Sequence, residues 1–236
     1  KELEAKIREY EEVLANPEKV KAIIREELKQ VARKYGDERR TQITEPIREF
    51  DDIDLVRRED ILVTVSHQGY VKRVPLETYR RQHRGGKGIV GAQTKDEDFI
   101  KHVFVCSTID TILFFTDRGR VHWLRGYLIP EAGRNAKGKP IVNLLKLDEG
   151  EKIAAVIPIK QFSQDQYLLM TTRRGIVKKT VLSAYSRPRQ GGIIAVTLRE
   201  GDALMEVKLT DGRQDVILST RNGMSIRFPE VEVKPV

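Results

Sequence analysis

The first 35 residues carry apolar side chains at spacings of three and four, in two runs: Leu3, Ile7, Tyr10, Leu14 and Val20, Ile24, Leu28, Val31, Tyr35. This spacing is typical of amphipathic helices. Asn16 can cap the second helix, Pro17 suits its first position and Gly36 its end. The pattern predicts an α-helical hairpin over residues 1–36 whose apolar stripes cover each other, or the end of a longer coiled coil that packs on a further surface.

Residues 37–54, which end in the acidic run Asp51-Asp52-Ile53-Asp54, show neither the helical nor the strand period. They predict a linker or a first edge strand. We place the linker at residues 37–58, and a separate repeat domain over residues 59–236.

From Ile61 onward, short apolar runs alternate with turns, and one pattern occurs four times. Each unit has an apolar run, a turn with a glycine, and a second strand. The turn glycines are Gly69, Gly119, Gly175 and Gly223, spaced by 50, 56 and 48 residues. A period near 50 with about four strands per unit is typical of propeller-like blades, which are stable only when stacked on neighbours.

Two further markers recur in the first three units. An apolar pair follows a glycine-containing basic loop at Ile89-Val90, Ile141-Val142 and Ile193-Ile194, and an acidic turn residue follows at Asp96, Asp148 and Glu200. The sequence therefore predicts a mainly all-β fold of about three blades plus the start of a fourth, preceded by the helical hairpin. Because the fourth unit stops at Val236, we expect the chain to be cut from a longer protein.

Positive charge is concentrated in the repeat domain. The chain holds 43 Lys+Arg and 35 Asp+Glu, a net charge of +8, while residues 1–50 are neutral. The segment Lys72 to Lys95 has a single acid, Glu77, and seven cations: Lys72, Arg73, Arg80, Arg81, Arg84, Lys87 and Lys95. Such a patch favours a polyanion, most simply a phosphate backbone, although a solvated basic surface is the alternative.

The sharpest local motif is Gln82-His83-Arg84-Gly85-Gly86-Lys87-Gly88 in the loop of the first unit. Its glycines let the backbone approach a ligand, and its cations suit phosphate; it lacks the Gly-Lys-Ser/Thr ending of a P-loop. An ordinary flexible loop is the alternative.

The matching loops of the other units are also basic. They carry Arg134, Lys137 and Lys139 in the second unit and Arg187 and Arg189 in the third, and the third unit's second strand carries Lys178 and Lys179. Recurrence in register predicts a curved basic rim that bends duplex DNA with little base readout, rather than loops that are merely soluble.

Other chemistry is weakly indicated. Cys106 is the only cysteine, which excludes an intramolecular disulfide, and His67, His83, His102 and His122 have no metal-ligand spacing. We expect Cys106 to be a small buried hydrophobe, Trp123 to pack in a core or between blades, and the chain to hold no metal and no cofactor. No apolar run is long enough to span a membrane, so we expect no membrane partner and a cytoplasmic, nucleoid-associated protein.

The heptapeptide at residues 82–88 resembles the gyrase A box, Gln-(Arg/Lys)-Arg-Gly-Gly-(Arg/Lys)-Gly, of the bacterial DNA gyrase A family. Lys34-Tyr35-Gly36-Asp37-Glu38-Arg39-Arg40-Thr41 is similar to the end of that family's cleavage domain. Ala136-Lys137-Gly138-Lys139-Pro140-Ile141-Val142-Asn143 and Ser186-Arg187-Pro188-Arg189 are similar to its second and third blade loops. The resemblance covers essentially the whole chain.

The resemblance implies a β-pinwheel, a propeller-shaped ring or spiral normally of six blades, that wraps DNA around its basic rim. It also implies double-stranded DNA, gyrase B and a second gyrase A as partners in a type II topoisomerase. That enzyme introduces negative supercoils with ATP hydrolysed on gyrase B, and uses ATP and Mg on other segments. The cleavage tyrosine, its arginine, the metal-binding acids and the ATPase lie outside this chain in the family, so the fragment alone is not expected to be an enzyme.

The box roles carry over to Gln82, Arg84, Gly85, Gly86, Lys87 and Gly88, while His83 departs from the pattern and removes a cation at neutral pH. Two alternatives stay open. One is the C-terminal domain of the topoisomerase IV C subunit, whose box is usually degraded or missing. The other is a blade-repeat scaffold that binds an acidic protein.

The motif generates a direct prediction. Replacing Arg84 and Lys87 together by alanine should leave the fold intact, because both residues belong to a loop, but should reduce DNA wrapping more than simple binding. Circular dichroism checks the fold, and the linking-number change that the protein imposes on closed-circular DNA measures wrapping. Unchanged wrapping by the double variant would refute the role of the box.

Overall fold

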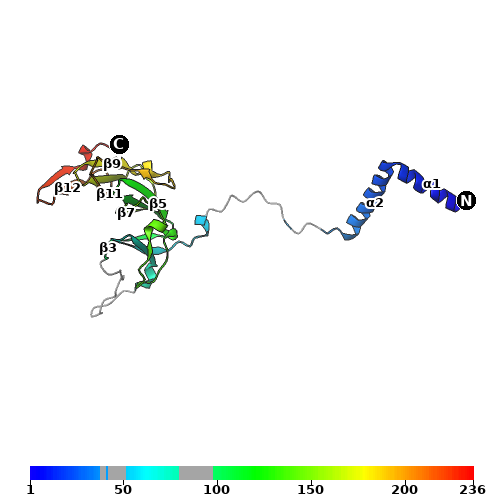
Figure 1. Cartoon of the computed structure of the whole chain (residues 1–236), viewed down its shortest axis with the longest axis horizontal. Coiled ribbons are helices and arrows are strands. Elements are labelled where there is room, and N and C mark those ends of the chain that lie inside the picture. Colours follow the sequence, from blue (N-terminus) through cyan, green and yellow to red (C-terminus); the bar gives the residue numbers. More distant parts are fainter. Residues whose placement is uncertain (38–40, 42–51, 80–97) are drawn as a thin grey trace. The chain divides into compact units, whose positions relative to one another are not determined.

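The structure is a computed structural model that describes residues 1–37, 41, 52–79 and 98–236 (Figure 1). The chain divides into two compact units, residues 1–49 and 50–236, which are described separately. The first is helical in its described part, and the second contains every described strand.

The two predicted helices are present as α1 (Glu2–Ala15) and α2 (Pro17–Tyr35). The Asn16 side chain accepts a hydrogen bond from the Glu18 backbone N–H at 3.1 Å, and Pro17 occupies the first turn, as predicted. The expectation that the helices cover each other's apolar stripes is wrong. Their axes diverge at Asn16 (Figure 1), and neither helix has a buried residue, so Leu3 and Leu28 remain 77% and 61% exposed.

Most of the predicted linker, residues 38–40 and 42–51, lies outside the described residues. Asp52–Leu55 forms a short 3-10 helix just before the first strand.

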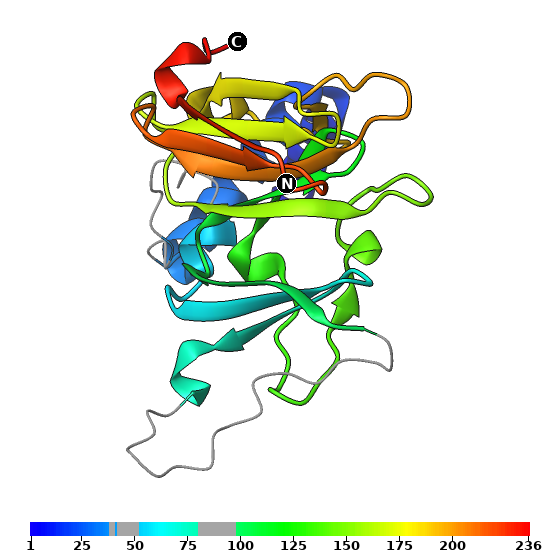
Figure 2. The same cartoon turned by 90° about the vertical axis from the view of Figure 1, so that its left-hand side faces the viewer.

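Four antiparallel sheets follow, and each contains one of the predicted glycine hairpins. Figure 2 shows the cyan first sheet at the bottom, green strands of the second above it, and the yellow and orange strands of the later sheets overlapping at the top. We call the four sheets blades 1 to 4. The hairpins are β1 (Asp60–Ser66) with β2 (Tyr70–Pro75), β4 (Thr111–Thr116) with β5 (Arg120–Arg125), β8 (Tyr167–Thr172) with β9 (Val177–Val181), and β12 (Asp215–Ser219) with β13 (Ser225–Pro229).

A third strand joins the first strand of three hairpins. These strands are β3 (Ile100–Ser107), β7 (Ile153–Ile159) and β11 (Leu204–Thr210). Because β7 lies beside both β3 and β11, this edge of the blades is where neighbouring sheets converge. The opposite edge, next to β2, β5 and β9, is therefore the outer edge.

The outer edge of a blade is completed by the following unit. The short strand β6 (Lys139–Pro140) belongs to the second unit but pairs with β2 of blade 1, and β10 (Ile193–Ile194) of the third unit pairs with β5 of blade 2. Blades 1 and 2 thus have the strand orders β3-β1-β2-β6 and β7-β4-β5-β10. Such a blade cannot form from one unit alone.

The strands β6 and β10, which pair with the preceding blade, correct the predicted alignment of the units. Val71 pairs with Lys139, whereas its counterpart Val121 pairs with Ile193, so Ile193 corresponds to Lys139. The residue equivalent to Ile141 is Ala195: each donates its backbone N–H at 2.8 Å to the carbonyl of a turn glycine, Gly69 or Gly119. The predicted apolar-pair marker was misaligned by two residues in the third unit.

Each hairpin turn contains a glycine, and in three of the turns a hydroxyl side chain also accepts a backbone N–H. The four turn glycines have positive φ between 77° and 84°, which side chains disfavour. Three residues earlier, the hydroxyls of Ser66, Thr116 and Thr172 accept a backbone N–H at 3.0 to 3.2 Å.

A carboxylate supports the turns of blades 1 and 3. Asp98 and Asp202 accept the N–H groups of Gln68 and Arg174. Burial raises the pKa of Asp202, but hydrogen bonds from Thr172 and two backbone N–H groups outweigh that effect and hold the pKa below its usual value. The acids that close these turns lie two residues after the predicted markers Asp96 and Glu200, of which Asp96 is outside the described residues.

Two apolar clusters fill the spaces between blades. One joins blades 1 and 2 around Ile61, Val63, Ile112 and Phe114, and the other joins blades 2 and 3 around Phe115, Met170 and Leu204. Cys106 belongs to the first cluster and Trp123 packs against the second, as predicted for both. Apolar packing between neighbouring sheets therefore holds blades 1, 2 and 3 together.

The single thiol provides a test of this packing. Burial, followed by the charges of Asp110 and Asp60, raises the pKa of Cys106 to about 12. At pH 8 the native chain should react with a thiol reagent at least about a thousandfold more slowly than the denatured chain, because little thiolate forms and access is blocked. Stopped-flow labelling measures both rates. Rapid labelling of the native chain would show that the first cluster is open.

Candidate nucleic-acid interface

The basic loop of the second unit, residues 131–138, wraps around the outer edge of blade 1 and encloses Lys72. The Lys72 side chain is only 2% exposed, and its Nζ donates to the carbonyls of Gly133, Arg134 and Ala136, the first at 3.3 Å and the last at 2.8 Å. An ammonium group has three N–H donors, so all are used. Burial lowers the pKa of Lys72. The structure therefore buries Lys72, and none of its N–H groups is left free for the predicted contact with DNA.

Neighbouring Arg73 ties the start of the same loop. Its Nε donates to the Ile129 carbonyl at 2.8 Å, and its Nη2 lies 3.2 Å from the Glu131 carboxylate. Its backbone also forms a parallel bridge with Glu131. The half-buried guanidinium is thus engaged within the protein, and Arg73 anchors the loop instead of presenting a free charge.

The loop of the third unit, residues 186–192, is held differently on blade 2. Its Gly192 lies on the buried His122 ring, so closely that a Cβ there would be 2.7 Å from Cε1. Arg120 donates through Nη2 to the Gly191 carbonyl, and Trp123 donates through Nε1 to the Tyr185 carbonyl at 2.8 Å. Burial, the largest effect, lowers the pKa of His122. A neutral ring here takes the place that the Lys72 ammonium has in blade 1.

The basic pair of β9 is also structural. Lys179 is 4% exposed, its Nζ donates to the Glu230 carbonyl at 2.9 Å and lies 3.9 Å from the Glu230 carboxylate. Lys178 is half-buried and donates to the Ala195 carbonyl at 2.8 Å. The ammonium groups of Lys179 and Lys178, both predicted to contact DNA, are therefore engaged within the protein.

The remaining predicted cations lie in the two loops, except for Lys139, which begins the short strand β6 directly after the first of them. Lys137, Lys139, Arg187 and Arg189 are exposed and Arg134 is half-buried. Within the part of the chain that the structure describes, none of these five charged groups forms a hydrogen bond or ion pair. Arg134 also lies near Tyr79, since burial raises the pKa of Tyr79 and the charge of Arg134 opposes that effect. The structure therefore places unpaired positive charge in successive loops at the outer edge.

The basic loop of the first unit falls outside the described residues. It contains Arg80 and Arg81, and the heptapeptide Gln82, His83, Arg84, Gly85, Gly86, Lys87 and Gly88. Tyr79, at the end of the last described turn before them, precedes this segment directly.

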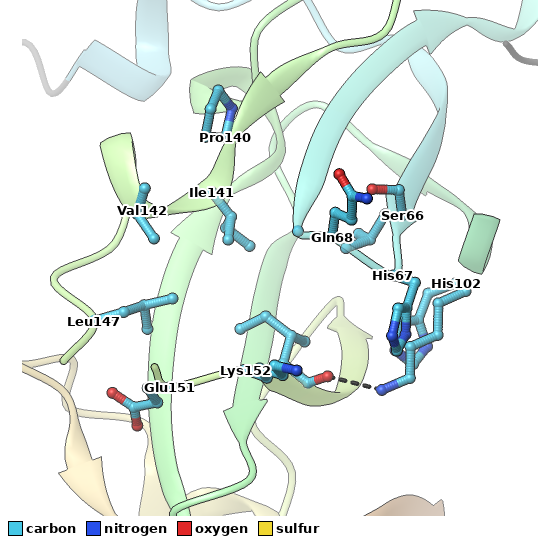
Figure 3. Close-up of a pocket in the computed structure, with 14 residues that line it drawn as sticks. Ser66, His67, Gln68, His102, Pro140, Ile141, Val142, Leu147, Glu151 and Lys152 are labelled. Carbon is cyan, nitrogen blue, oxygen red and sulfur yellow. Dashed lines mark hydrogen bonds between the residues drawn. The ribbon is translucent and has the colours of Figure 1, made fainter. Parts of the chain in front are cut away.

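A crevice of about 370 Å³ lies between blades 1 and 2 (Figure 3). Ile141 and Leu147 line one side, the turn Ser66 to Gln68 lines the other, and Lys101 Nζ donates to the Ile153 carbonyl across it. Its charged lining is mixed, because Glu151 lies beside Lys152. The crevice is therefore distinct in character from the basic loops.

No group of three His, Cys, Asp or Glu side chains suited to a metal occurs among the described residues. None of the described helices is long and apolar enough to cross a membrane.

Sequence reasoning missed the internal contacts made by the residues three and four positions after the first three turn glycines. These are Lys72, His122 and Lys178 at the first position and Arg73, Trp123 and Lys179 at the second. The signal was present, because large polar side chains recur in register in the middle of strands. A cation flanked by buried strand residues, such as Lys72 between Val71 and Val74, indicates an internal partner.

The comparisons with known proteins agree with the blades. A family model described as the DNA gyrase C-terminal domain, beta-propeller, matches residues 60–107, 110–160, 166–211 and 214–236, one segment for each blade. The A subunit of DNA gyrase from Halalkalibacterium halodurans is 49% identical over 99% of this chain, and that from Clostridium acetobutylicum is 47% identical over all of it. The chain spans 28% of the length of each.

Solved structures show the same architecture. The crystal structure of the C-terminal domain of DNA topoisomerase IV matches with a TM-score of 0.66 and 35% identity, covering 77% of this chain and 55% of that one. A structure of the DNA gyrase A C-terminal domain matches with a TM-score of 0.59 over 75% of this chain and 57% of that one. Its identity of 24% supports the likeness of fold alone.

The loop around Lys72 predicts the effect of one substitution. Gly138 has φ +86°, and a Cβ there would lie 2.6 Å from the Val71 carbonyl oxygen. Gly138→Ala should lower the free energy of unfolding by roughly 1–3 kcal/mol, since both the backbone conformation and the close approach are unfavourable. Gly133→Ala, in the same loop with nothing within 4 Å of its Cβ, is the control and should change it by less than about 0.5 kcal/mol. Urea unfolding measures both, and equal effects would contradict the close approach at Gly138.

Proposed function

Because the chain belongs to the family of the DNA gyrase C-terminal domain, we propose that its outer edge binds, bends and wraps duplex DNA without sequence specificity. The observation that carries this proposal is the exposed cations of the two loops, residues 131–138 and 186–192, and of Lys139 at the start of β6, which have no partner in the described part of the chain. Flexible cationic side chains suit phosphates, which are the same at every base pair. Loops that recur once per blade offer contacts at intervals along a curved path.

Bending follows from the arrangement of these loops. Successive blades converge at the strands β3, β7 and β11, so their outer edges diverge, and a duplex that touches one loop after another must curve around them. The bend has an elastic cost that several phosphate contacts can offset. The family's box at residues 82–88 would extend the same path in blade 1.

At the level of the whole protein, we propose that this chain is part of the A subunit of DNA gyrase, a type II topoisomerase. Its partners would be a second gyrase A and gyrase B, and its wrapping of DNA would support ATP-dependent negative supercoiling in the bacterial cytoplasm. The relatives named as DNA gyrase support this assignment. The likeness to the topoisomerase IV domain, at 35% identity, makes the C subunit of that enzyme the second candidate.

Salt dependence tests the phosphate contacts. Lys137→Ala with Lys139→Ala should reduce the slope of log K against log salt by about 0.9 for each phosphate that is no longer neutralised. Lys160→Ala with Arg199→Ala is the matched control, because these exposed cations lie outside the two basic loops, Lys160 directly after the inner strand β7 and Arg199 before the turn that leads to β11, and should leave the slope unchanged. Fluorescence anisotropy with a short duplex gives the slopes. Equal slopes for the two double variants would remove these loop cations from the interface.

Wrapping has its own measurement. The protein is bound to relaxed closed-circular DNA, the DNA is relaxed again by a nicking-closing topoisomerase, and the linking number is read on a gel after the protein is removed. A signed shift that grows with protein and decreases in the Lys137→Ala, Lys139→Ala variant is the expected result. Tight, salt-sensitive binding without a shift would favour a non-wrapping relative. Binding that an acidic protein abolishes better than duplex DNA would favour the scaffold alternative.

A further inference from the structure

Lys72 brings together a buried ammonium group and three converging carbonyl groups, each of which would be unfavourable without the other. Its ammonium is buried, which costs free energy unless hydrogen bonds replace water. Three carbonyl oxygens of residues 133, 134 and 136 converge on one point, where their dipoles repel each other without a donor. The ammonium satisfies all three carbonyls, and they supply its full set of acceptors.

This contact determines the direction of the loop. With three carbonyls turned inward to Lys72 Nζ, and with Gly138 held against the Val71 carbonyl, the loop is attached to blade 1 at both of these residues. Arg134 and the exposed Lys137 and Lys139 lie within or directly after this stretch. The unpaired charges are thus carried by the second unit but oriented by a side chain of the first.

We propose that Lys72 is a positioning residue of the DNA interface, whose ammonium fixes the loop of residues 133–138 so that Arg134, Lys137 and Lys139 meet phosphates without a further ordering cost. The inference rests on the proposed function, since it assumes that these cations bind DNA. Lys72 acts through the loop and makes no phosphate contact of its own.

The hydrogen-bonding arrangement around Lys72 in blade 1 is not repeated in blade 2. His122 occupies the register position of Lys72 but its Nε2 has no hydrogen-bond partner among the described residues, and the loop is tied instead by Arg120 to the Gly191 carbonyl. Among the described residues of the blades, an ammonium group that donates to three carbonyls of one loop therefore occurs only at Lys72 in blade 1.

The experiment compares Lys72→Met with Lys137→Met, which both remove one positive charge. Amide hydrogen exchange of residues 133–139 in the free protein and the salt slope of duplex binding are measured for each. Lys72→Met should raise the exchange at least about tenfold and weaken binding about tenfold, the cost of ordering one or two residues, with an unchanged slope. Lys137→Met should leave exchange unchanged and lower the slope by about 0.9.

Lys72→Arg separates charge from geometry and serves if the methionine variant does not fold. A guanidinium keeps the charge but is planar and larger, so it cannot direct three N–H groups to converging carbonyls. It should raise loop exchange as Lys72→Met does. Restored wild-type exchange and affinity in Lys72→Arg would overturn the proposal.

Two results for Lys72→Met would also overturn the proposal. One is a slope reduced by about 0.9 with unchanged exchange, which would make Lys72 a phosphate contact. The other is unchanged exchange together with unchanged affinity. Failure of the wild-type chain to bind duplex DNA would instead refute the proposed function, while exchange in the free protein would still report on anchoring.

Discussion

The pairing of the outer edges of blades 1 and 2 with a strand of the next unit is the constraint on which the domain depends. An unpaired strand edge leaves backbone N–H and C=O groups without partners, and β6 and β10 satisfy them for β2 and β5. To reach that edge, the chain must leave its own hairpin and pass around the preceding blade. The segments that make this passage are the loops at residues 131–138 and 186–192. The fold therefore requires loops at the outer edge, and the sequence places the unpaired cations there.

The same constraint explains why so much positive charge is used internally. A loop that lies on a neighbouring blade presents carbonyl groups to it, and these need donors. Lys72 supplies an ammonium, Arg120 and Arg73 supply guanidinium groups, and Trp123 supplies an indole N–H. The basic composition of the strands thus serves hydrogen bonding between blades. Charge counted along the sequence overstates the charge available to a polyanion.

Sequence reasoning predicted the repeat well because its signals are local. A glycine with positive φ between two apolar runs, and Asn16 before Pro17, depend on a few adjacent residues. It misaligned Ile193 because the strand crossing depends on a partner more than 70 residues away, and two adjacent isoleucines imitate the expected apolar pair. Sequence reasoning assigned Lys72 and Lys179 to DNA because the alternation of residues along a strand does not show whether another segment covers the strand face that carries them. It also expected the stripes of α1 and α2 to pair, which a bend at Asn16 prevents.

The division between anchoring and free cations bears on how a duplex would be bent. A bend stores elastic energy, so the contacts that maintain it must not move when the DNA pulls on them. Exposed lysines on an unsupported loop would follow the duplex and allow it to straighten. The loop of residues 131–138 is tied to blade 1 at Glu131, Gly133, Arg134 and Ala136, and Ile129 before it and Ile141 after it are tied to the same blade at Arg73 and Gly69. Force on Lys137 or Lys139 is thereby distributed over two blades and the apolar cluster between them, so the packed core resists the straightening of the proposed DNA path.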